Sequence, residues 1–385
     1  MSAQPDSHDE TAALLRDAAA DFLAHEHSRE RLRGIYQGES PIRREVWRQF
    51  AQQGWLSLRW PEALGGTGLD LSTAAVLAEQ LGRHVVPEPF VASAAMPAAL
   101  AQALAHGDAA AAWQALAEGC AEGITLTALA WQDDAQTLAP QTTARAERVA
   151  GGYRLGARKF GVVAASLADV FLVTAELEGA PALWQVPRDA AGVSMQVHPT
   201  SDGSNVAVVD FEGVQLPAQA LLAHGPEVEE ALERAIDEAL VLTAAQLIGV
   251  ADAALELTLD YLRTRVQFGR HIGSFQAMQH AAVDVRLQLV LARAGLRAAL
   301  NRHAADPLAA STRAAIAAAK ARASDAALQA GRFGVQAHGA IGFAAESDIG
   351  LYLKAALRLA AWLGNGSQQR ERYGRFAGIH DEANE

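Results

Sequence analysis

The residues best suited to chemistry lie in one short stretch that is rich in arginine and glutamine. It carries Arg263, Arg265 and Arg270, with the side-chain amides of Gln267 and Gln276 close by in the sequence. A planar guanidinium can bind two oxygens at once, so arginines beside amide donors suit a phosphate or a pyrophosphate. The alternative is a solvated helical hairpin whose charges face water, and the spacing alone leaves both interpretations open.

Two long helical patterns flank this stretch and would position it. Residues 237–264 carry leucines at helix-compatible spacings, and residues 275–304 follow as a second helical run. Gly269 and Gly273 permit a tight reversal between the two runs. The pattern therefore predicts two antiparallel helices joined by a loop that presents the arginines.

A second feature of interest is a glycine-rich run further along the chain, from Gln336 to Phe343. It contains Gly339 and Gly342. Glycines in such a run would let the backbone approach a pyrophosphate closely. An ordinary turn also needs glycines. This run therefore indicates a pyrophosphate site only in combination with the arginine stretch.

The composition is that of a helix-rich globular protein with room for two or three domains. The chain has 385 residues, of which half are hydrophobic and a fifth are charged. Its net charge of −12 argues against a nucleic-acid partner. Cys120 is the only cysteine, so no internal disulfide can form and a reducing compartment fits.

The sequence also argues against secretion, membrane insertion and metal binding. It starts with polar and acidic residues, unlike a signal peptide, and no uninterrupted apolar run is long enough for a membrane span. His271, His280 and His338 lack the spacing of a metal site. We therefore expect a cytoplasmic protein without a metal.

The hydrophobic period changes twice and divides the chain into three segments. Residues 1–120 have helical patterns, residues 121–226 alternate with a period of two, and helical patterns return in residues 227–385. Short apolar strands separated by turns predict a small antiparallel barrel or sandwich in the middle. The sequence thus predicts a mainly α protein with a central β-domain.

The arginine stretch and its surroundings closely resemble the acyl-CoA dehydrogenase family. The string R-T-R-x-Q-F-G-R-x-I-G-x-F-Q-x-x-Q-H resembles the family's signature hairpin. The first segment is similar to its N-terminal domain in the order G-W-L, W-P-E, G-G-x-G-L and P-x-P-F. The resemblance covers the whole chain and implies an N-terminal helical domain, a middle antiparallel β-barrel and a C-terminal four-helix bundle.

The resemblance implies FAD as the cofactor, held across a subunit interface. Eight residues match cofactor-contacting positions: Arg265, Phe268, Gln276, Gln336, Gly339, Ala340, Ser367 and Gln369. The first three would bind the pyrophosphate and adenine side of FAD. The next three would meet the cofactor of a neighbouring subunit, and the last two would keep contacts on the flavin side.

The catalytic base is where this sequence departs from the family. The family removes the α-proton of an acyl thioester with a carboxylate and passes the β-hydride to the flavin. At the usual C-terminal glutamate position this chain has Asn365 or Gly364, which cannot serve as a base. A minority of the family places the base on the helix before the hairpin, at about Ala239 here. Glu238 is then the candidate base and Asp237 the second candidate, unless both are helix-surface charges.

Such losses are similar to those of family members in which two unlike chains form α2β2 tetramers that act on steroid-derived CoA thioesters. Three interpretations stay open. The chain is an FAD-dependent acyl-CoA dehydrogenase in a homo- or hetero-oligomer, a scaffold subunit without activity, or an acyl-CoA oxidase. A dehydrogenase of this family would use an electron-transfer flavoprotein as its partner. Apolar helices at residues 281–300 and 312–328 suit a bundle buried against a second subunit.

Overall fold

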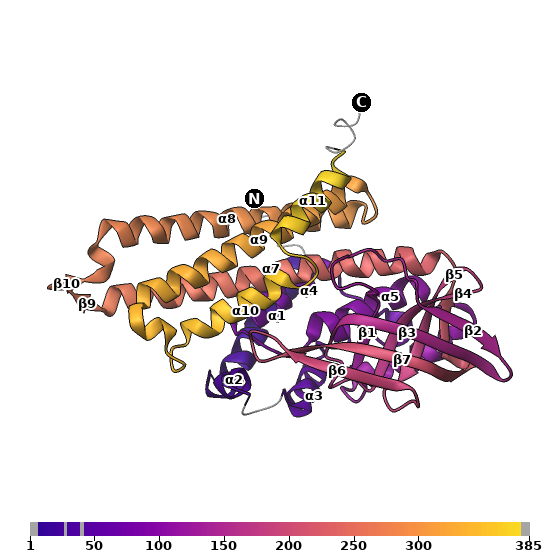
Figure 1. Cartoon of the computed structure of the whole chain (residues 1–385). Coiled ribbons are helices and arrows are strands. Elements are labelled where there is room, and N and C mark those ends of the chain that lie inside the picture. The colour runs from indigo at the N-terminus through magenta and orange to yellow at the C-terminus, as the bar shows by residue number, and fades with distance from the viewer. Residues whose placement is uncertain (1–6, 27–28, 39–41, 379–385) are drawn as a thin grey trace.

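The computed structural model describes residues 7–26, 29–38 and 42–378, and it has three parts in sequence order. Helices form the first part, a sheet forms the second, and long helices form the third (Figure 1). Buried apolar side chains from all three parts belong to one hydrophobic core. The predicted order of helical, β and helical parts is therefore confirmed, while the division at residues 120 and 226 remains our proposal.

The first part packs its helices around large aromatic side chains. Trp47 and Phe50 lie on the buried face of α3, and Phe50 packs against Trp55 with 4.9 Å between ring centroids. The helices are α1 (Ser7–Glu26), α2 (Arg29–Tyr36), α3 (Arg44–Gln52), α4 (Leu71–Arg83), α5 (Met96–Leu104) and α6 (Ala110–Ala121). Short helical turns connect them, namely η1 (Glu62–Leu64), η2 (Val91–Ala95) and η3 (Gly107–Ala109).

The second part is one sheet in which β1 lies outside the main strand order, beside β4. That order is β6-β7-β3-β2-β4-β5-β8. The strands are β1 (Thr127–Ala130), β2 (Arg145–Val149), β3 (Gly152–Val163), β4 (Val170–Leu177), β5 (Ala180–Pro187), β6 (Val193–Pro199), β7 (Asn205–Pro217) and β8 (Leu221–His224), with η4 (Ala218–Ala220) before β8. β4 and β5 are buried along most of their length, which explains their nearly continuous apolar sequences.

The sheet is mixed, which corrects the expectation of an antiparallel barrel. β1 and β2 both pair with β4 in parallel, whereas the β2–β3, β4–β5 and β6–β7 neighbours form antiparallel pairs. A parallel pair needs a long connection between its strands. The segment from Trp131 to Asp169, which contains β2 and β3, supplies that connection between β1 and β4. An alternating sequence does not reveal such a crossover.

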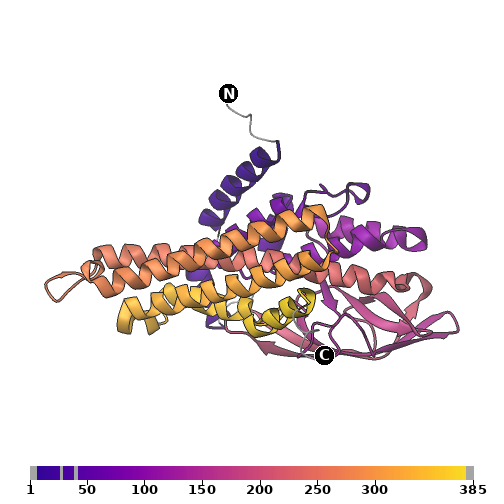
Figure 2. The same cartoon turned by 90° about the horizontal axis from the view of Figure 1, so that it is seen from above.

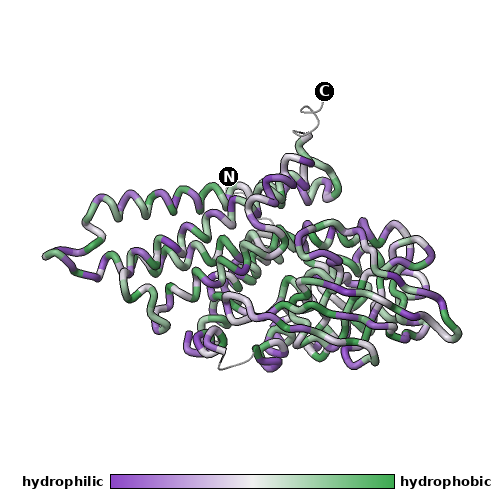
Figure 3. The backbone as a smooth tube through the Cα atoms, in the orientation of Figure 1, coloured by the Kyte–Doolittle hydropathy of each residue, from purple (hydrophilic) through white to green (hydrophobic). Residues whose placement is uncertain are grey.

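The third part is a bundle of four helices followed by a short fifth helix. The helices are α7 (Glu227–Thr264), α8 (Gln276–Ala305), α9 (Ala310–His338), α10 (Ile349–Ala361) and α11 (Gly366–Phe376). The connections contain β9 (Val266–Gln267), β10 (Arg270–His271), η5 (Ile272–Ser274) and η6 (Gly339–Phe343). Figures 1 and 2 show α7, α8 and α9 running side by side. Hydrophilic and hydrophobic residues alternate along these helices in Figure 3, as helices with one buried face require.

α7 is the central helix that joins the first part to the bundle. It is the one helix in the described ranges that is long and apolar enough to cross a membrane, but 78% of its apolar window is buried inside the protein. It crosses α4 at close range, because a Cβ on Gly82 would lie 2.0 Å from the carbonyl oxygen of Gln246. A Cβ on Gly249 would lie equally close to the carbonyl oxygen of Glu79. Only glycine permits this approach at the two positions.

Candidate active site

A cavity beside the predicted C-terminal site lies between the sheet and the bundle, and we call it the sheet–bundle cavity. Its volume is about 390 Å³, within the range of small-molecule sites. The loop after β1 forms one wall, and the turn between α10 and α11 forms the opposite wall. The end of β3 and the β6–β7 turn close the side between them.

The polar lining of the sheet–bundle cavity consists of amides, hydroxyls and one guanidinium. Among the described residues that line it there is no aspartate or glutamate. These polar residues are Gln132, Gln136, Thr137, Thr200, Ser201, Ser204, Asn205, Arg358 and Gln368. Val163, Leu363 and the ring of Trp362 supply apolar surface. Such a lining suits a flat ring system with hydrogen-bonding atoms at its edge, and it offers no proton-accepting carboxylate.

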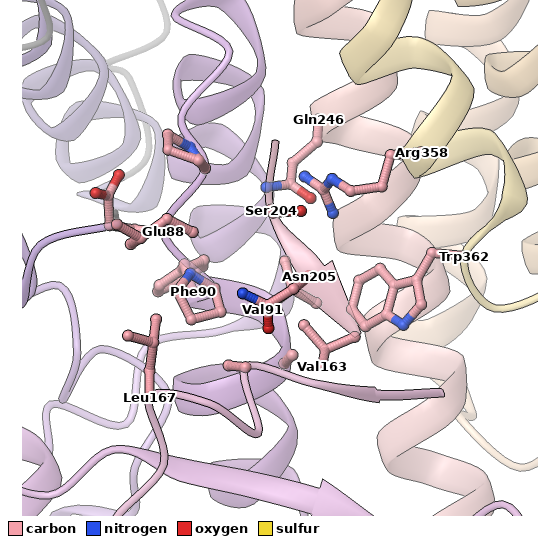
Figure 4. A pocket seen from close by; sticks show the side chains of 15 residues that line it. Glu88, Phe90, Val91, Val163, Leu167, Ser204, Asn205, Gln246, Arg358 and Trp362 are labelled. Carbon is pink, nitrogen blue, oxygen red and sulfur yellow. The ribbon is translucent and has the colours of Figure 1, made fainter. Parts of the chain in front are cut away.

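A second cavity adjoins the first and reaches toward the N-terminal helices (Figure 4). The two cavities share Val163, Ser204, Asn205, Arg358 and Trp362. The volume of the second is only about 30 Å³, which is enough for water but not for an acyl chain. We call it the closed cleft, because a ligand could enter only if its walls moved apart.

The two charged residues of the closed cleft are both held in ion pairs. Glu88 pairs with Arg31, and burial raises the pKa of Glu88 even though Arg31 opposes that change. Arg358 pairs with Asp202 at the β6–β7 turn. Burial alone would raise the pKa of Asp202, but Arg358 and the hydrogen bond from Ser204 outweigh it and lower the pKa. Asp202 is therefore an ionised anchor for Arg358 and a poor proton acceptor.

The turn between α10 and α11 contains the residue at the family's usual base position. Asn365 caps α11, because its Oδ1 accepts hydrogen bonds from the backbone of Ser367 at 2.9 Å and of Gln368 at 3.1 Å. The backbone N–H of Asn365 in turn donates to Gln368 Oε1 at 2.9 Å, so the two residues form a capping box. Gln369 is fully buried, and its Nε2 donates to the carbonyl oxygen of Leu363 at 2.6 Å. Ser367 is exposed, and the side chain that reaches the cavity is that of Gln368.

The other six predicted cofactor residues gather at the opposite end of the bundle. Arg265, Phe268 and Gln276 lie on the hairpin between α7 and α8, at the far left of Figure 1. Gln336, Gly339 and Ala340 lie where α9 ends, and this end meets α7 because His338 stacks on Tyr261 with 4.1 Å between ring centroids. All six are exposed, and Phe268 is 90% exposed. Lys320 of α9 contacts the turn that lines the sheet–bundle cavity, and the helix from Lys320 to His338 puts about 27 Å between this turn and the end of α9.

The two predicted base candidates lie on α7 in two separate buried ion-pair clusters. Glu238 contacts Arg59 at 2.5 Å and Arg234 at 3.3 Å. Asp237 contacts Arg372 at 2.7 Å and Arg313 at 3.1 Å. Burial raises the pKa of Asp237, although both arginines oppose that change.

These contacts exclude one of the two interpretations of Glu238 and Asp237. Both acids are nearly inaccessible rather than helix-surface charges, and neither lines the two cavities. The role of Glu238 as a base, with Asp237 second, remains a prediction.

Comparison with known proteins relates this arrangement to one family. The profile described as "Acyl-CoA dehydrogenase, N-terminal domain" matches residues 9–123, and "Acyl-CoA dehydrogenase, C-terminal domain" matches residues 230–378. The chain belongs to the acyl-CoA dehydrogenase family. It is thereby a flavin oxidoreductase by descent, and the fold expected from the resemblance is the one observed apart from the mixed sheet.

Three relatives within the acyl-CoA dehydrogenase family cover nearly the whole chain. Acyl-CoA dehydrogenase IpdE2 of Mycobacterium tuberculosis is 31% identical over 348 residues, which are 90% of this chain and 91% of that protein. A solved variant of the steroid acyl-CoA dehydrogenase Tcur3481-Tcur3483 has 29% identity and a TM-score of 0.85, with 97% and 99% of the two chains covered. The ChsE4-ChsE5 complex from Mycobacterium tuberculosis has 26% identity and a TM-score of 0.83, with 98% and 99% covered.

Sequence reasoning missed several residues that line the cavities of this acyl-CoA dehydrogenase. Arg358 and Gln246 lie on α10 and α7, among residues whose helical pattern gives no sign of a site. Gln368 was passed over in favour of its neighbours Ser367 and Gln369. A helical model of the C-terminal turn would have separated the buried Gln369 from the cavity-facing Gln368, because successive helical residues point about 100° apart.

Proposed function

We propose that this chain is one subunit of a heteromeric, FAD-dependent acyl-CoA dehydrogenase that acts on the CoA thioester of a bulky, steroid-derived acid. Family membership supports the reaction class. Two similar solved structures support the assembly and the substrate, since one is a steroid acyl-CoA dehydrogenase and the other is a complex of two different chains. The proposed location is the cytoplasm, and the proposed electron acceptor is an electron-transfer flavoprotein.

The observation that carries the proposal is the missing carboxylate. No aspartate or glutamate is among the described residues that line the sheet–bundle cavity, and the cap residue Asn365 stands where the family usually has its base. Removal of an α-proton needs a group of suitable pKa within hydrogen-bond reach. A partner chain with an intact site would supply that group, and this chain would then complete the cofactor site.

The described residues fit FAD in two places. The sheet–bundle cavity has the volume and the amide-rich edge for a flavin ring, with Gln132 and Gln368 on opposite walls and Trp362 excluding water. The exposed hairpin residues Arg265 and Gln276 suit the pyrophosphate and adenine side of a second cofactor, at the far end of the bundle. When bound, FAD would accept the hydride from the β-carbon of the acyl group.

Assembly is supported by apolar surface that one chain leaves exposed. Val283, Leu287, Val290 and Leu291 are each about half exposed along α8. Phe268 and Phe343 are still more exposed at the hairpin end, at 90% and 82%. Apolar patches of this kind mark interaction sites on soluble proteins. A second chain seated on α8 would bury the first group of residues and bring its own cavity within reach of the hairpin.

The scaffold alternative is favoured by one observation, the closed cleft. Its volume of about 30 Å³ leaves no room for an acyl group in this chain. A chain whose cleft stays closed would stabilise a catalytic partner without binding substrate itself. An acyl-CoA oxidase would differ only in its electron acceptor. Comparing how fast oxygen and an electron-transfer flavoprotein re-oxidise the reduced flavin separates the oxidase from the dehydrogenase.

The test is to purify the chain alone and together with acyl-CoA dehydrogenase-like chains encoded beside its gene. We expect flavin absorbance and acyl-CoA-dependent reduction of an electron acceptor only in the complex. High flavin content and full activity of the chain alone would contradict the heteromeric proposal. The scaffold alternative would be favoured if the partner chain binds flavin and has the same activity with and without this chain.

Variants of the predicted residues test their roles within that complex. Arg265→Ala should lower flavin content markedly, because a charge-assisted hydrogen bond contributes about 1.5–3 kcal/mol. Arg148→Ala serves as the matched control, since Arg148 is an exposed arginine of β2 that pairs with Glu178, away from the hairpin. Glu238→Gln should reduce activity about 100-fold with flavin retained if Glu238 is the base. Full activity of that variant and of Asp237→Asn would place the base on the partner chain.

A further inference from the structure

A lysine with no acidic partner is buried beside the sheet–bundle cavity. Lys320 lies on α9 and is fully buried. Its Nζ contacts Ser324 Oγ at 3.3 Å, the carbonyl oxygen of Ala360 at 3.3 Å and that of Gly364 at 3.5 Å. No carboxylate of the described residues lies within ion-pair distance of this amine. Lysine is rarely buried without such a partner, so the position calls for a reason.

The contacts of Lys320 converge on one wall of the cavity. Ala360 is the second-last residue of α10, and the residues that follow it, Ala361 to Gly364, line the cavity. The chain bends sharply here, with φ of 55° at Leu363 and 88° at Gly364. A left-handed conformation is unfavourable for a residue such as leucine, because its Cβ comes too close to the following carbonyl oxygen. External hydrogen bonds must therefore hold the bend in place.

Two side chains from different helices provide those bonds. Lys320 on α9 donates to the carbonyls of Ala360 and Gly364, and Gln369 on α11 donates to that of Leu363. The last carbonyls of a helix have no partner within the helix and carry the negative end of its dipole. An amine placed against the end of α10 satisfies them. We call residues 361–365 the cavity turn.

We propose that Lys320 is a positioning residue that holds the cavity turn in place, and that the protonation state of its amine sets how tightly this wall closes on the flavin. A charged lysine has three N–H donors, one for each of its three acceptors. A neutral amine has only two. The bond to Gly364 is the longest of the three, so it is the one released when the proton leaves.

The surroundings let this change occur near neutral pH. Burial lowers the pKa of Lys320 to about 7, and burial is its only cause. Four pairs of ionisable residues on or beside the neighbouring helices are engaged with one another, not with Lys320. Arg358 of α10 pairs with Asp202, Arg370 of α11 pairs with Asp325 of α9, and Asp237 of α7 pairs with Arg313 and Arg372.

The amine can be observed directly because the chain has only three lysines, Lys159, Lys320 and Lys354. Labelling lysine with ¹³C at Cε and ¹⁵N at Nζ gives three side-chain signals. Lys320→Met and Lys320→Gln identify the signal of Lys320, and Lys354→Met identifies that of the exposed Lys354. We expect the Lys320 signal to titrate between about pH 6 and 8. Titration above pH 9 would overturn the proposal.

Amide hydrogen exchange tests whether the amine acts on the cavity turn. Exchange at residues 361–365 should quicken as pH rises through the titration, beyond the intrinsic effect of pH on exchange. Lys320→Met should remove this extra change, and Lys354→Met should retain it. An unchanged pH response in Lys320→Met would overturn the proposal. If neither variant at position 320 folds, the coincidence of the two titrations in the unmodified protein still decides the matter.

Flavin affinity gives the final measurement, and only this one rests on the proposed function. In the flavin-binding complex, the dissociation constant of FAD should rise about threefold to tenfold from pH 6 to 8.5, the effect of one hydrogen bond. Lys320→Met should abolish that rise, whereas Lys354→Met should keep it. A rise that persists in Lys320→Met would overturn the positioning role. A protein that binds no flavin under any condition would instead refute the proposed function, with the titration and exchange results still standing.

Discussion

The two walls of the sheet–bundle cavity are each held by a buried lysine, but in different electrostatic settings. Lys159 of β3 pairs with Asp133 on the loop after β1, and it also contacts Thr142 at 3.0 Å and Thr174 at 3.1 Å. Lys320 holds the opposite wall through carbonyl oxygens and a hydroxyl alone. Burial lowers the pKa of Lys159 too, but Asp133 opposes the change. One wall is thus held by a buried charge pair, and the other by an amine that can lose its proton.

The two settings give the two buried lysines different responses to pH. The pair of Lys159 with Asp133 is a fixed charge interaction, and the carboxylate also accepts hydrogen bonds from the backbone of Ala144 at 3.2 Å and from Thr142 Oγ1 at 2.9 Å. Burial would raise the pKa of Asp133, but Lys159 and the hydrogen bonds from the Thr143 backbone and the Thr142 hydroxyl lower it. Lys320 has no such compensation, so its wall responds to pH. The walls meet where Gln368 Nε2 donates to the carbonyl oxygen of Gln136 at 3.1 Å.

At pH 7, the largest expected effect on stability comes from breaking the charge pair. Lys159→Met should lower the free energy of unfolding by about 3 kcal/mol at pH 7, because it leaves the Asp133 carboxylate without its buried partner. Urea denaturation of the variant against the unmodified chain measures this. Lys159→Met combined with Asp133→Asn should recover part of the loss. A loss below about 0.5 kcal/mol for the single variant would show that the two walls do not differ as described.

A dependence of stability on pH should distinguish Lys320. Its pKa in the folded protein is about 7, below the ordinary value of 10.5, so the unfolded chain binds more protons between these two pH values. The free energy of unfolding therefore gains up to about 1.4 kcal/mol per pH unit from this group as pH rises from 7 toward 10, and the penalty of burying the charge is complete below 7. Lys320→Met should lack this gain. Parallel stability–pH curves for the two proteins would contradict it.

The second anchor of the cavity turn should have a smaller effect. Gln369→Met keeps the volume of the buried side chain and removes the 2.6 Å bond to the carbonyl of Leu363. An unsatisfied buried carbonyl costs about 1–3 kcal/mol, so we expect a loss of about 1.5 kcal/mol without a change in pH dependence. Thermal unfolding at two pH values checks both parts. A loss that varied with pH would mean that the two anchors do not act independently.

The smallest expected effect concerns the cap of α11. Asn365→Ala should cost about 1 kcal/mol, the usual value of an N-cap residue. Asn365→Asp should keep the cap and even favour it, because a negative charge suits a helix N-terminus. The pair of variants separates capping from any other role of this position. Equal stability of all three proteins in urea would argue that the capping box does not secure the turn.

The sequence was most informative where periodicity alone decides the structure. The helices around the hairpin were predicted close to their observed positions, and the segment with a period of two is the one that forms the sheet. The parallel pairing of β1 and β2 with β4 was not predicted, since it depends on which distant strands meet. The burial of Lys159 and Lys320 was also beyond prediction, because lysines in helical and strand patterns are usually on the surface.

The candidate site was predicted only in part, for a related reason. The family resemblance supplied the residues of the hairpin and of the C-terminal turn, but it could not tell which of them one chain brings together. The structure places Arg265 and Gln369 at opposite ends of the bundle. It also pairs Glu238 with Arg59, a contact between segments that are far apart in the sequence.

The separation of the hairpin from the sheet–bundle cavity has a consequence for how the protein must be handled. If one FAD takes its flavin contacts from one chain and its pyrophosphate contacts from another, then each bound cofactor also counts as a bond between chains. Cofactor retention would then depend on protein concentration, as for any ligand linked to assembly. Dilution would release flavin and subunits together, and added FAD would draw the chains back into the complex. The measured flavin content would therefore depend on the protein concentration of the preparation as well as on the amino-acid sequence.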